Sequence, residues 1–315
     1  MHPALSVILF TTFSGAGYGV IFWLGLISEA EFYPPHWGFG LLAFGLGLGA
    51  VTVGLLASTA HLGHPERAWR AFSQWRTSWL SREGVAAVLT YIPAGLFGLG
   101  WVFWGENGGF WGVLGVLAAA LSVVTVVCTA YIYRSLKTVQ RWSNGWVLPN
   151  YLALAAMTGA LWLDLAAAVT VQTFTPSAVA ALCSIPVAVF LKLNYWRFID
   201  ESQSASTAES ATGLGSLGKV RLFEAPHTSD NYLMKEMGFQ IARKHAKKLR
   251  LIAVLAGFAA PFLLTALALV MPGTIRIVAA LIAAPVATVG ILVERWLFFA
   301  EARHTVTLYY GSSTA

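Results

Sequence analysis

The sequence predicts an all-α polytopic membrane protein with eight transmembrane helices, and its composition and its apolar runs carry this prediction. Of the 315 residues, 57% are hydrophobic and 11% are charged, whereas a soluble domain usually carries about 25% charged residues. A helix needs about 20 apolar residues to cross a hydrocarbon core of about 30 Å. Eight runs reach that length, near 4–28, 38–60, 84–104, 110–133, 151–174, 176–196, 251–271 and 275–300.

The eight runs divide the chain into three parts. Residues 1–199 hold helices one to six, and the first run predicts a membrane span rather than a cleavable signal because no basic region precedes it. Residues 200–250 form a long hydrophilic loop, and residues 251–315 hold helices seven and eight with a short tail. Within the loop, 231–250 has the pattern of a basic amphipathic helix, which suits anionic lipid or a partner subunit equally.

The net charge of +6 reports topology, because the basic residues gather in alternate loops and form no nucleic-acid-binding patch. They fall between spans two and three (Arg67, Arg70, Arg76, Arg82), between four and five (Arg134, Lys137, Arg141) and, ten in number, from Lys192 to Arg250. The opposite loops are acidic or neutral, with Arg276 as the exception. Since Lys and Arg stay on the cytoplasmic side, both termini are expected in the cytoplasm.

The densest set of polar residues lies where span two ends and span three begins. His61, His64 and Arg67 stand on one side of a Trp-rich loop, and Arg82 and Glu83 on the other. A quinone needs an apolar slot, hydrogen-bond partners and a proton path, and His and a partly buried Glu can supply the last two. On spacing alone, interfacial histidines and an acid favoured by the helix dipole explain the same pattern.

Other ionisable residues lie inside or beside the later spans. Glu294, Arg295, Glu301 and His304 form a second polar set, expected to pair with Arg134 or to line the same pocket. Asp164 stands without an obvious partner in span five. A structural hydrogen bond is the default expectation for it, and a proton path is the alternative.

Small residues and potential metal ligands give further expectations. Gly15, Gly19, Gly45 and Gly49 have the spacing of helix contacts. Cys128 and Cys183 stand alone in apolar runs, which predicts buried residues and neither a zinc nor an iron–sulfur site in this chain. The histidines lie in loops or at span ends, so no haem between helices and no other metal site is expected.

Specific motifs resemble the DMSO reductase anchor subunit (DmsC) family over nearly the whole chain. The most specific is the turn His61-Leu62-Gly63-His64-Pro65, followed by Ser81-Arg82-Glu83. The resemblance implies a non-catalytic anchor in the bacterial inner membrane. Such an anchor exchanges electrons between a quinone, ubiquinone or menaquinone, and an iron–sulfur subunit that serves a molybdopterin catalytic subunit. In that family the residues matching His61 and Glu83 are linked to quinol binding.

Two departures point to one branch of the family. The hydrophilic loop 200–250 is long, and His64 occupies a position that need not be His. Both features resemble anchors of cytoplasm-facing complexes that oxidise sulfite. We therefore expect sulfite oxidation to feed electrons into quinone, with DMSO-type reduction as the alternative.

Two readings from other classes also remain open. A secondary transporter would place ionisable residues near the membrane midplane, often in repeated halves. A purely structural anchor would bind no quinone.

Overall fold

A computed structural model of the protein describes residues 3–29, 36–60, 62–171, 176–202, 206–224, 228–229, 235, 241–271 and 273–312. Within these residues, eight helices have the length and hydropathy needed to cross a bilayer, as the sequence predicted. The spans are α1 (Leu5–Glu29), α2 (Trp37–Thr59), α3 (Trp79–Leu99) with the π-helical turn η2 (Gly100–Trp104), α4 (Gly109–Arg134), α5 (Val147–Thr170), α6 (Pro176–Glu201), α10 (Ala246–Val254) with the π-helical turn η4 (Leu255–Ala259) and α11 (Ala260–Val270), and α12 (Thr274–Ala300).

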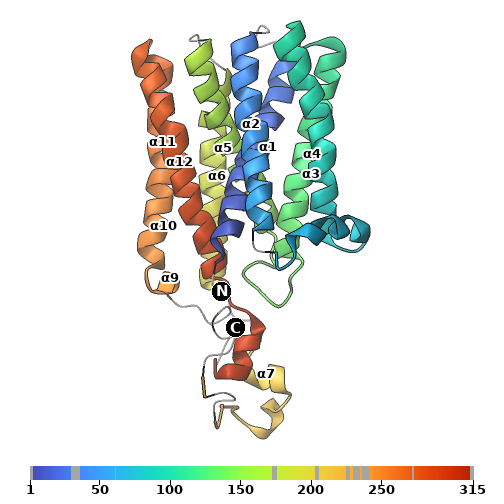
Figure 1. Cartoon of the computed structure of the whole chain (residues 1–315). Coiled ribbons are helices and arrows are strands. Elements are labelled where there is room, and N and C mark those ends of the chain that lie inside the picture. Colours follow the sequence, from blue (N-terminus) through green and yellow to red (C-terminus); the bar gives the residue numbers. More distant parts are fainter. Residues whose placement is uncertain are drawn as a thin grey trace.

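Shorter helices lie outside the spans. They are η1 (Pro65–Gln74), α7 (Ala208–Thr212), η3 (Gly215–Leu217), α9 (Ile241–Lys244) and η5 (Thr305–Tyr310). Figure 1 shows η1, α7 and α9 at the same end of the bundle, together with the start of α1 and the end of α12. We call this end, with η1, the 135–146 connection, α9 and η5, the basic end.

Helix α1 lies at the centre of the bundle. It packs against α2, α4, α5 and α12, while α3 lies against α4 on one side and α10 and α11 against α12 on the other (Figure 1). Tryptophan indoles link the central helices by hydrogen bonds: Trp23 Nε1 donates to the carbonyl oxygen of Ala156 at 2.7 Å, and Trp162 Nε1 to Thr288 Oγ1 at 3.0 Å. Such bonds stabilise helix contacts in lipid, where the hydrophobic effect does not drive helices together.

The start of α3 differs from the predicted boundary at residue 84. The helix begins at Trp79 because the Ser78 hydroxyl caps it by accepting a hydrogen bond from the Ser81 amide at 3.4 Å. Glu83 is therefore inside the helix, and only 4% of it is exposed. Because the Ser78 cap starts the helix earlier than predicted, Glu83 lies in the protein interior and not at the predicted membrane interface.

The sixth span also runs further than its hydrophobic pattern predicts. It continues to Glu201, five residues beyond the predicted end at Trp196. Lys192 lies within the predicted run, although the charge pattern counted it with the basic loop, and it is 1% exposed. In the predicted amphipathic segment, Ala246–Arg250 is the start of α10, and residues 231–234 and 236–240 lie outside the described residues. The loop is thus shorter than 200–250 at both ends.

Two expectations about small residues are partly wrong. Gly15, Gly45 and Gly49 have open space where a Cβ would lie, whereas Gly19 faces the backbone of Ala155 on α5. Cys128 is buried as predicted, but Cys183 is exposed on the outside of α6. Spacing alone does not say which face of a span meets lipid.

Candidate functional site

Glu83 on α3 is bound from the neighbouring helix by a single side chain. The Thr129 hydroxyl of α4 donates a hydrogen bond to Glu83 Oε1, and both residues are buried. Arg82 turns away: its Nε donates to the Trp75 carbonyl oxygen at 3.0 Å, and its guanidinium lies 4.2 Å from the Trp79 ring centroid. In the described part of the chain, no cation forms an ion pair with Glu83.

The other members of the predicted quinone cluster lie at the surface or are not described. His64 Nδ1 is 3.1 Å from Glu66 Oε1 and Arg67 Nε is 3.6 Å from the same oxygen, with all three side chains exposed. His61 lies outside the described residues. The structure thus places His64, directly before η1, and Arg67, within it, on the surface, and Glu83 in the interior. The helix η1 reaches α3 through Phe72, which packs beside Gly84.

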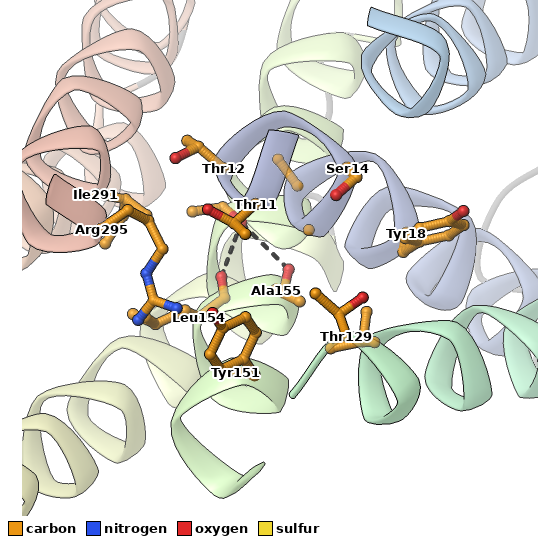
Figure 2. A pocket seen from close by; sticks show the side chains of 14 residues that line it. Thr11, Thr12, Ser14, Tyr18, Thr129, Tyr151, Leu154, Ala155, Ile291 and Arg295 are labelled. Atoms are coloured by element: carbon orange, nitrogen blue, oxygen red, sulfur yellow. Dashed lines mark hydrogen bonds between the residues drawn. The ribbon is translucent and has the colours of Figure 1, made fainter. Parts of the chain in front are cut away.

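A polar cavity of about 20 Å³ lies behind Thr129, between α1, α4, α5 and α12. Figure 2 shows Arg295, Tyr151, Thr129 and Tyr18 around this space. The buried hydroxyls of Thr12, Tyr18 and Tyr151 line it and make no well-formed hydrogen bond within the described residues, although Thr125 is near Tyr18 and Arg295 near Tyr151. A cavity of this size accommodates about one water molecule, which needs two to four polar partners.

An apolar groove of about 230 Å³ adjoins the polar cavity. It runs between α1, α4 and α5 and is partly open. Its lining residues are Tyr18, Gly19, Phe22, Ser122, Val123, Val126, Leu152, Ala155 and Ala156. The groove and the cavity share Tyr18, Val126 and Ala155. Of these three residues, Tyr18 carries a hydroxyl, and its side chain lies between the apolar groove and the polar cavity.

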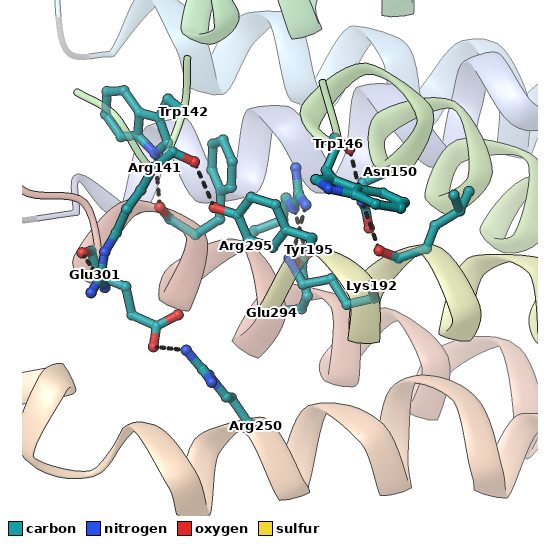
Figure 3. A network of polar contacts seen from close by, with 12 residues as sticks. Arg141, Trp142, Trp146, Asn150, Lys192, Tyr195, Arg250, Glu294, Arg295 and Glu301 are labelled. Carbon is teal, nitrogen blue, oxygen red and sulfur yellow. Dashed lines mark hydrogen bonds and ion pairs between the residues drawn. The ribbon is translucent and has the colours of Figure 1, made fainter. Parts of the chain in front are cut away.

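On the other side of the cavity, three charged residues form a buried group that we call the ion triad: Lys192 of α6 with Glu294 and Arg295 of α12. Glu294 accepts hydrogen bonds from Arg295 Nε at 2.5 Å and Nη2 at 2.8 Å and forms an ion pair with Lys192. Aromatic rings face the cations, with Arg295 4.4 Å from the Tyr151 centroid and Lys192 4.2 Å from that of Tyr195. Figure 3 shows Lys192, Glu294 and Arg295 close together.

Comparison with known proteins decides the family. The chain matches the model of the DMSO reductase anchor subunit (DmsC) family over residues 1–300. The chain belongs to this family. It is also 33% identical to a sulfite dehydrogenase subunit from Allochromatium vinosum over an alignment of 340 residues, which covers 99% of each chain. The resemblance inferred from the His-Leu-Gly-x-Pro turn is confirmed, and the chain is a multi-pass membrane anchor subunit.

The remaining polar residues of this anchor have partners that the sequence did not reveal. Glu301 pairs with Arg250 at 2.7 Å, and Arg134 Nη1 donates to the Tyr131 hydroxyl at 3.1 Å, so the expected pairing of Glu301 with Arg134 does not form. Glu294 pairs within the triad, not with Arg134. His304 caps η5 by accepting from the Val306 amide at 3.0 Å.

Asp164 has the structural hydrogen bond expected of it. The Ser177 hydroxyl donates to Asp164 Oδ1 at 3.2 Å, and Arg276 Nη2 lies 4.0 Å from the same oxygen. Arg276, the exception to the charge pattern of the loops, therefore has a buried carboxylate to pair with. The sequence did not reveal the pairing of Asp164 with Arg276, nor the roles of Lys192 and Thr129. The apolar pattern of one span does not show which residues of a distant span it will contact.

Proposed function

We propose that this anchor holds an iron–sulfur subunit and a molybdopterin catalytic subunit at the bacterial inner membrane and passes electrons from sulfite oxidation to quinone. Family membership and the likeness to the Allochromatium vinosum sulfite dehydrogenase subunit support this assignment. The family model carries the description of a DMSO reductase anchor, so the second candidate uses the same site to oxidise quinol. No observation favours a transporter.

The observation that carries the quinone proposal is a buried acid, Glu83, whose hydroxyl partner Thr129 lines the polar cavity that adjoins the apolar groove. Glu83 has a hydroxyl partner and no paired cation among the described residues, and ionisable groups at membrane depth mark proton and substrate paths. The groove offers apolar walls to a ring and its isoprenoid tail, and the Tyr18 hydroxyl stands where the groove meets the polar cavity.

This arrangement suits the chemistry of a quinone. Reduction of a quinone to a quinol takes up two electrons and two protons. The partner iron–sulfur subunit would supply the two electrons. Glu83, through Thr129 and the cavity, would deliver one proton to the bound ring, and a histidine on the η1 side, His61 or His64, would deliver the other. Arg295 borders the cavity and is paired with Glu294 behind it, and Arg82 and Arg134 lie towards the basic end.

His61, His64 and Arg67 stay predicted contributors to quinone binding from the η1 side. The basic end then faces the cytoplasm, where its positive loops and both termini are expected. It is the surface on which we place the partner subunits.

The test uses the intact complex, purified from its native membrane in mild detergent. Iron and molybdenum in stoichiometric amounts establish that the catalytic partners accompany the anchor. Sulfite-dependent reduction of a soluble quinone analogue is then compared with reduction of an artificial acceptor that takes electrons directly from the partner subunits.

Replacing Glu83→Gln should lower quinone reduction about hundredfold, the usual contribution of a positioned proton-transfer group, and leave the artificial acceptor reaction unchanged. Glu201→Gln, an exposed acid on α6 at the same end, is the control. Normal quinone turnover in Glu83→Gln would remove Glu83 from the site and favour a purely structural anchor. Turnover with DMSO and quinol but not with sulfite would select the second candidate.

A further inference from the structure

A second cavity at the basic end has the properties of an anion site. Its volume is about 520 Å³, and it lies between the ends of α6 and α12, the 135–146 connection, α9 and the start of α10. Seven Lys and Arg side chains line it against two carboxylates: Arg141, Arg243, Lys244, Lys247, Lys248, Arg250 and Arg303, with Asp200 and Glu301, and His245 and Ala246 complete the lining.

The positive charge in this cavity is largely uncompensated. Both carboxylates pair with Arg250, at 2.5 Å from Asp200 and 2.7 Å from Glu301. Within the described residues, none of the six other Lys and Arg side chains has an ion pair. Arg141 and Arg243 donate to carbonyl oxygens at the end of α12, of Glu301 at 2.9 Å and of Ala300 at 3.2 Å, which orients their guanidinium groups without neutralising them.

Hydrogen-bonding capacity is also left over. The Nε atoms of Arg250 and Arg303 are buried and make no hydrogen bond within the described part of the chain. One carboxylate oxygen of Glu301 likewise makes no hydrogen bond within the described residues, and it would repel an anion bound close to it. Burial, with the neighbouring Arg303 and Arg141 cations, lowers the pKa of Arg243 to about 10. An anion would relieve this repulsion and use the spare donors.

We propose that this cavity binds the phosphate group of an anionic phospholipid. Phosphate matches the planar N–H pairs of several arginines, and basic pockets between helices at a membrane surface suit such headgroups. Depth favours a lipid over a partner protein, since the cavity lies where the spans α6, α10 and α12 begin or end.

The neighbouring surface fits the acyl chains of the same molecule. Leu251, Ile252 and Leu255 follow Arg250 directly along α10 and its π-helical turn, and all three are exposed. The seventh span is among the least buried of the eight, with 33% of its apolar window inside the protein. A lipid with its phosphate in the cavity therefore has an apolar helix face along which its chains can lie.

The experiment measures binding to the purified full-length chain in neutral detergent. The probes are dioctanoyl phosphatidylglycerol, dioctanoylglycerol, which has the same chains without phosphate, and inorganic phosphate. We expect the phosphatidylglycerol to bind and the other two to bind much more weakly, because the site needs both the phosphate and the chains.

Two cavity variants and one control locate the binding. Arg303→Gln removes a cation with a spare donor, and the double change Lys247→Gln with Lys248→Gln removes two exposed cations that form no ion pair within the described residues. A lost charged hydrogen bond corresponds to about a tenfold weaker affinity. Arg197→Gln removes an exposed charge at the same end but outside the cavity, and it should change affinity less than about twofold.

Several outcomes would overturn the proposal. Equal binding of dioctanoylglycerol would mean that the apolar face alone recruits lipid. Unchanged affinity in both cavity variants would place the phosphate elsewhere, and binding of inorganic phosphate as tight as that of the lipid would make a free anion the ligand. Loss of the partner subunits from the Arg303→Gln complex, with lipid binding intact, would identify the cavity as a protein contact.

Discussion

Two buried carboxylates near the basic end, Glu83 and Glu294, have opposite surroundings. Glu294 is fully buried and has two cations, with Arg295 bound through two hydrogen bonds and Lys192 through an ion pair. Glu83 is 4% exposed and has the hydroxyl of Thr129. The polar cavity lies between the two, since Thr129 and Arg295 both line it.

The difference separates an acid whose burial the helix packing explains from an acid that the proposed chemistry would use. Moving a charge out of water costs several kcal/mol unless partners compensate it. The partners of Glu294 compensate its charge and join α6 to α12, which is a structural task. Glu83 lacks such compensation among the described residues, so its presence at this depth points to function.

The largest effect is expected from removing the charge of Glu294. Glu294→Gln leaves Lys192 and Arg295 buried without a carboxylate, which should lower the free energy of unfolding by about 3–5 kcal/mol. Glu83→Gln removes no cation's partner and should change it by less than about 1 kcal/mol. Unfolding of the detergent-solubilised chain in denaturant measures both, and equal destabilisation of the two variants would break the comparison.

Removing the partner of Glu83 should affect activity next most strongly. In Thr129→Val the carboxylate loses its hydrogen bond, and quinone reduction should fall about tenfold. Thr129→Ser keeps a hydroxyl and should stay near the native rate. The assay is sulfite-dependent quinone reduction by the intact complex, and a Val variant as fast as the Ser variant would show that this hydrogen bond is not needed.

The close contact of α1 with α5 at Gly19 should contribute to the stability of the bundle. The same contact lies next to Tyr18, which lines both the groove and the cavity. A Cβ at Gly19 would meet the carbonyl oxygen of Ala155, so Gly19→Ala should cost about 1–3 kcal/mol. Gly45→Ala on α2 meets open space and is the matched control. The temperature of unfolding in detergent measures both, and a Gly19→Ala variant as stable as the control would mean that the two helices can separate freely.

The smallest effect concerns His304 and the dependence of stability on pH. Burial lowers the pKa of His304, and its neutral ring accepts the Val306 amide hydrogen bond. Its contribution to stability is full above the unfolded pKa of about 6.5 and is lost as pH falls through the lower folded pKa.

Asparagine at this position keeps a capping oxygen but does not titrate. The native chain should therefore lose more thermal stability between pH 7.5 and 5.5 than His304→Asn, with the difference vanishing at the higher pH. Parallel curves for the two proteins would show that His304 does not titrate in this range.

The sequence alone indicates the family and the number of spans for identifiable reasons. Lipid solvates each span separately, so a run of about 20 apolar residues is sufficient to predict a helix. Motifs such as His61-Leu62-Gly63 are likewise local. Helix ends are less well predicted, because the Ser78 cap and the polar residues at the end of α6 extend spans beyond their apolar runs.

The candidate site was predictable only in part. A Glu beside span three could be identified from sequence, but its burial and its Thr129 partner depend on how α3 meets α4, across 46 residues of sequence. Apolar runs determine by themselves that this chain enters a membrane and how often it crosses. Only the tertiary structure decides that Glu294 has two cations and Glu83 a hydroxyl, because partners on different spans are chosen by the faces that pack together.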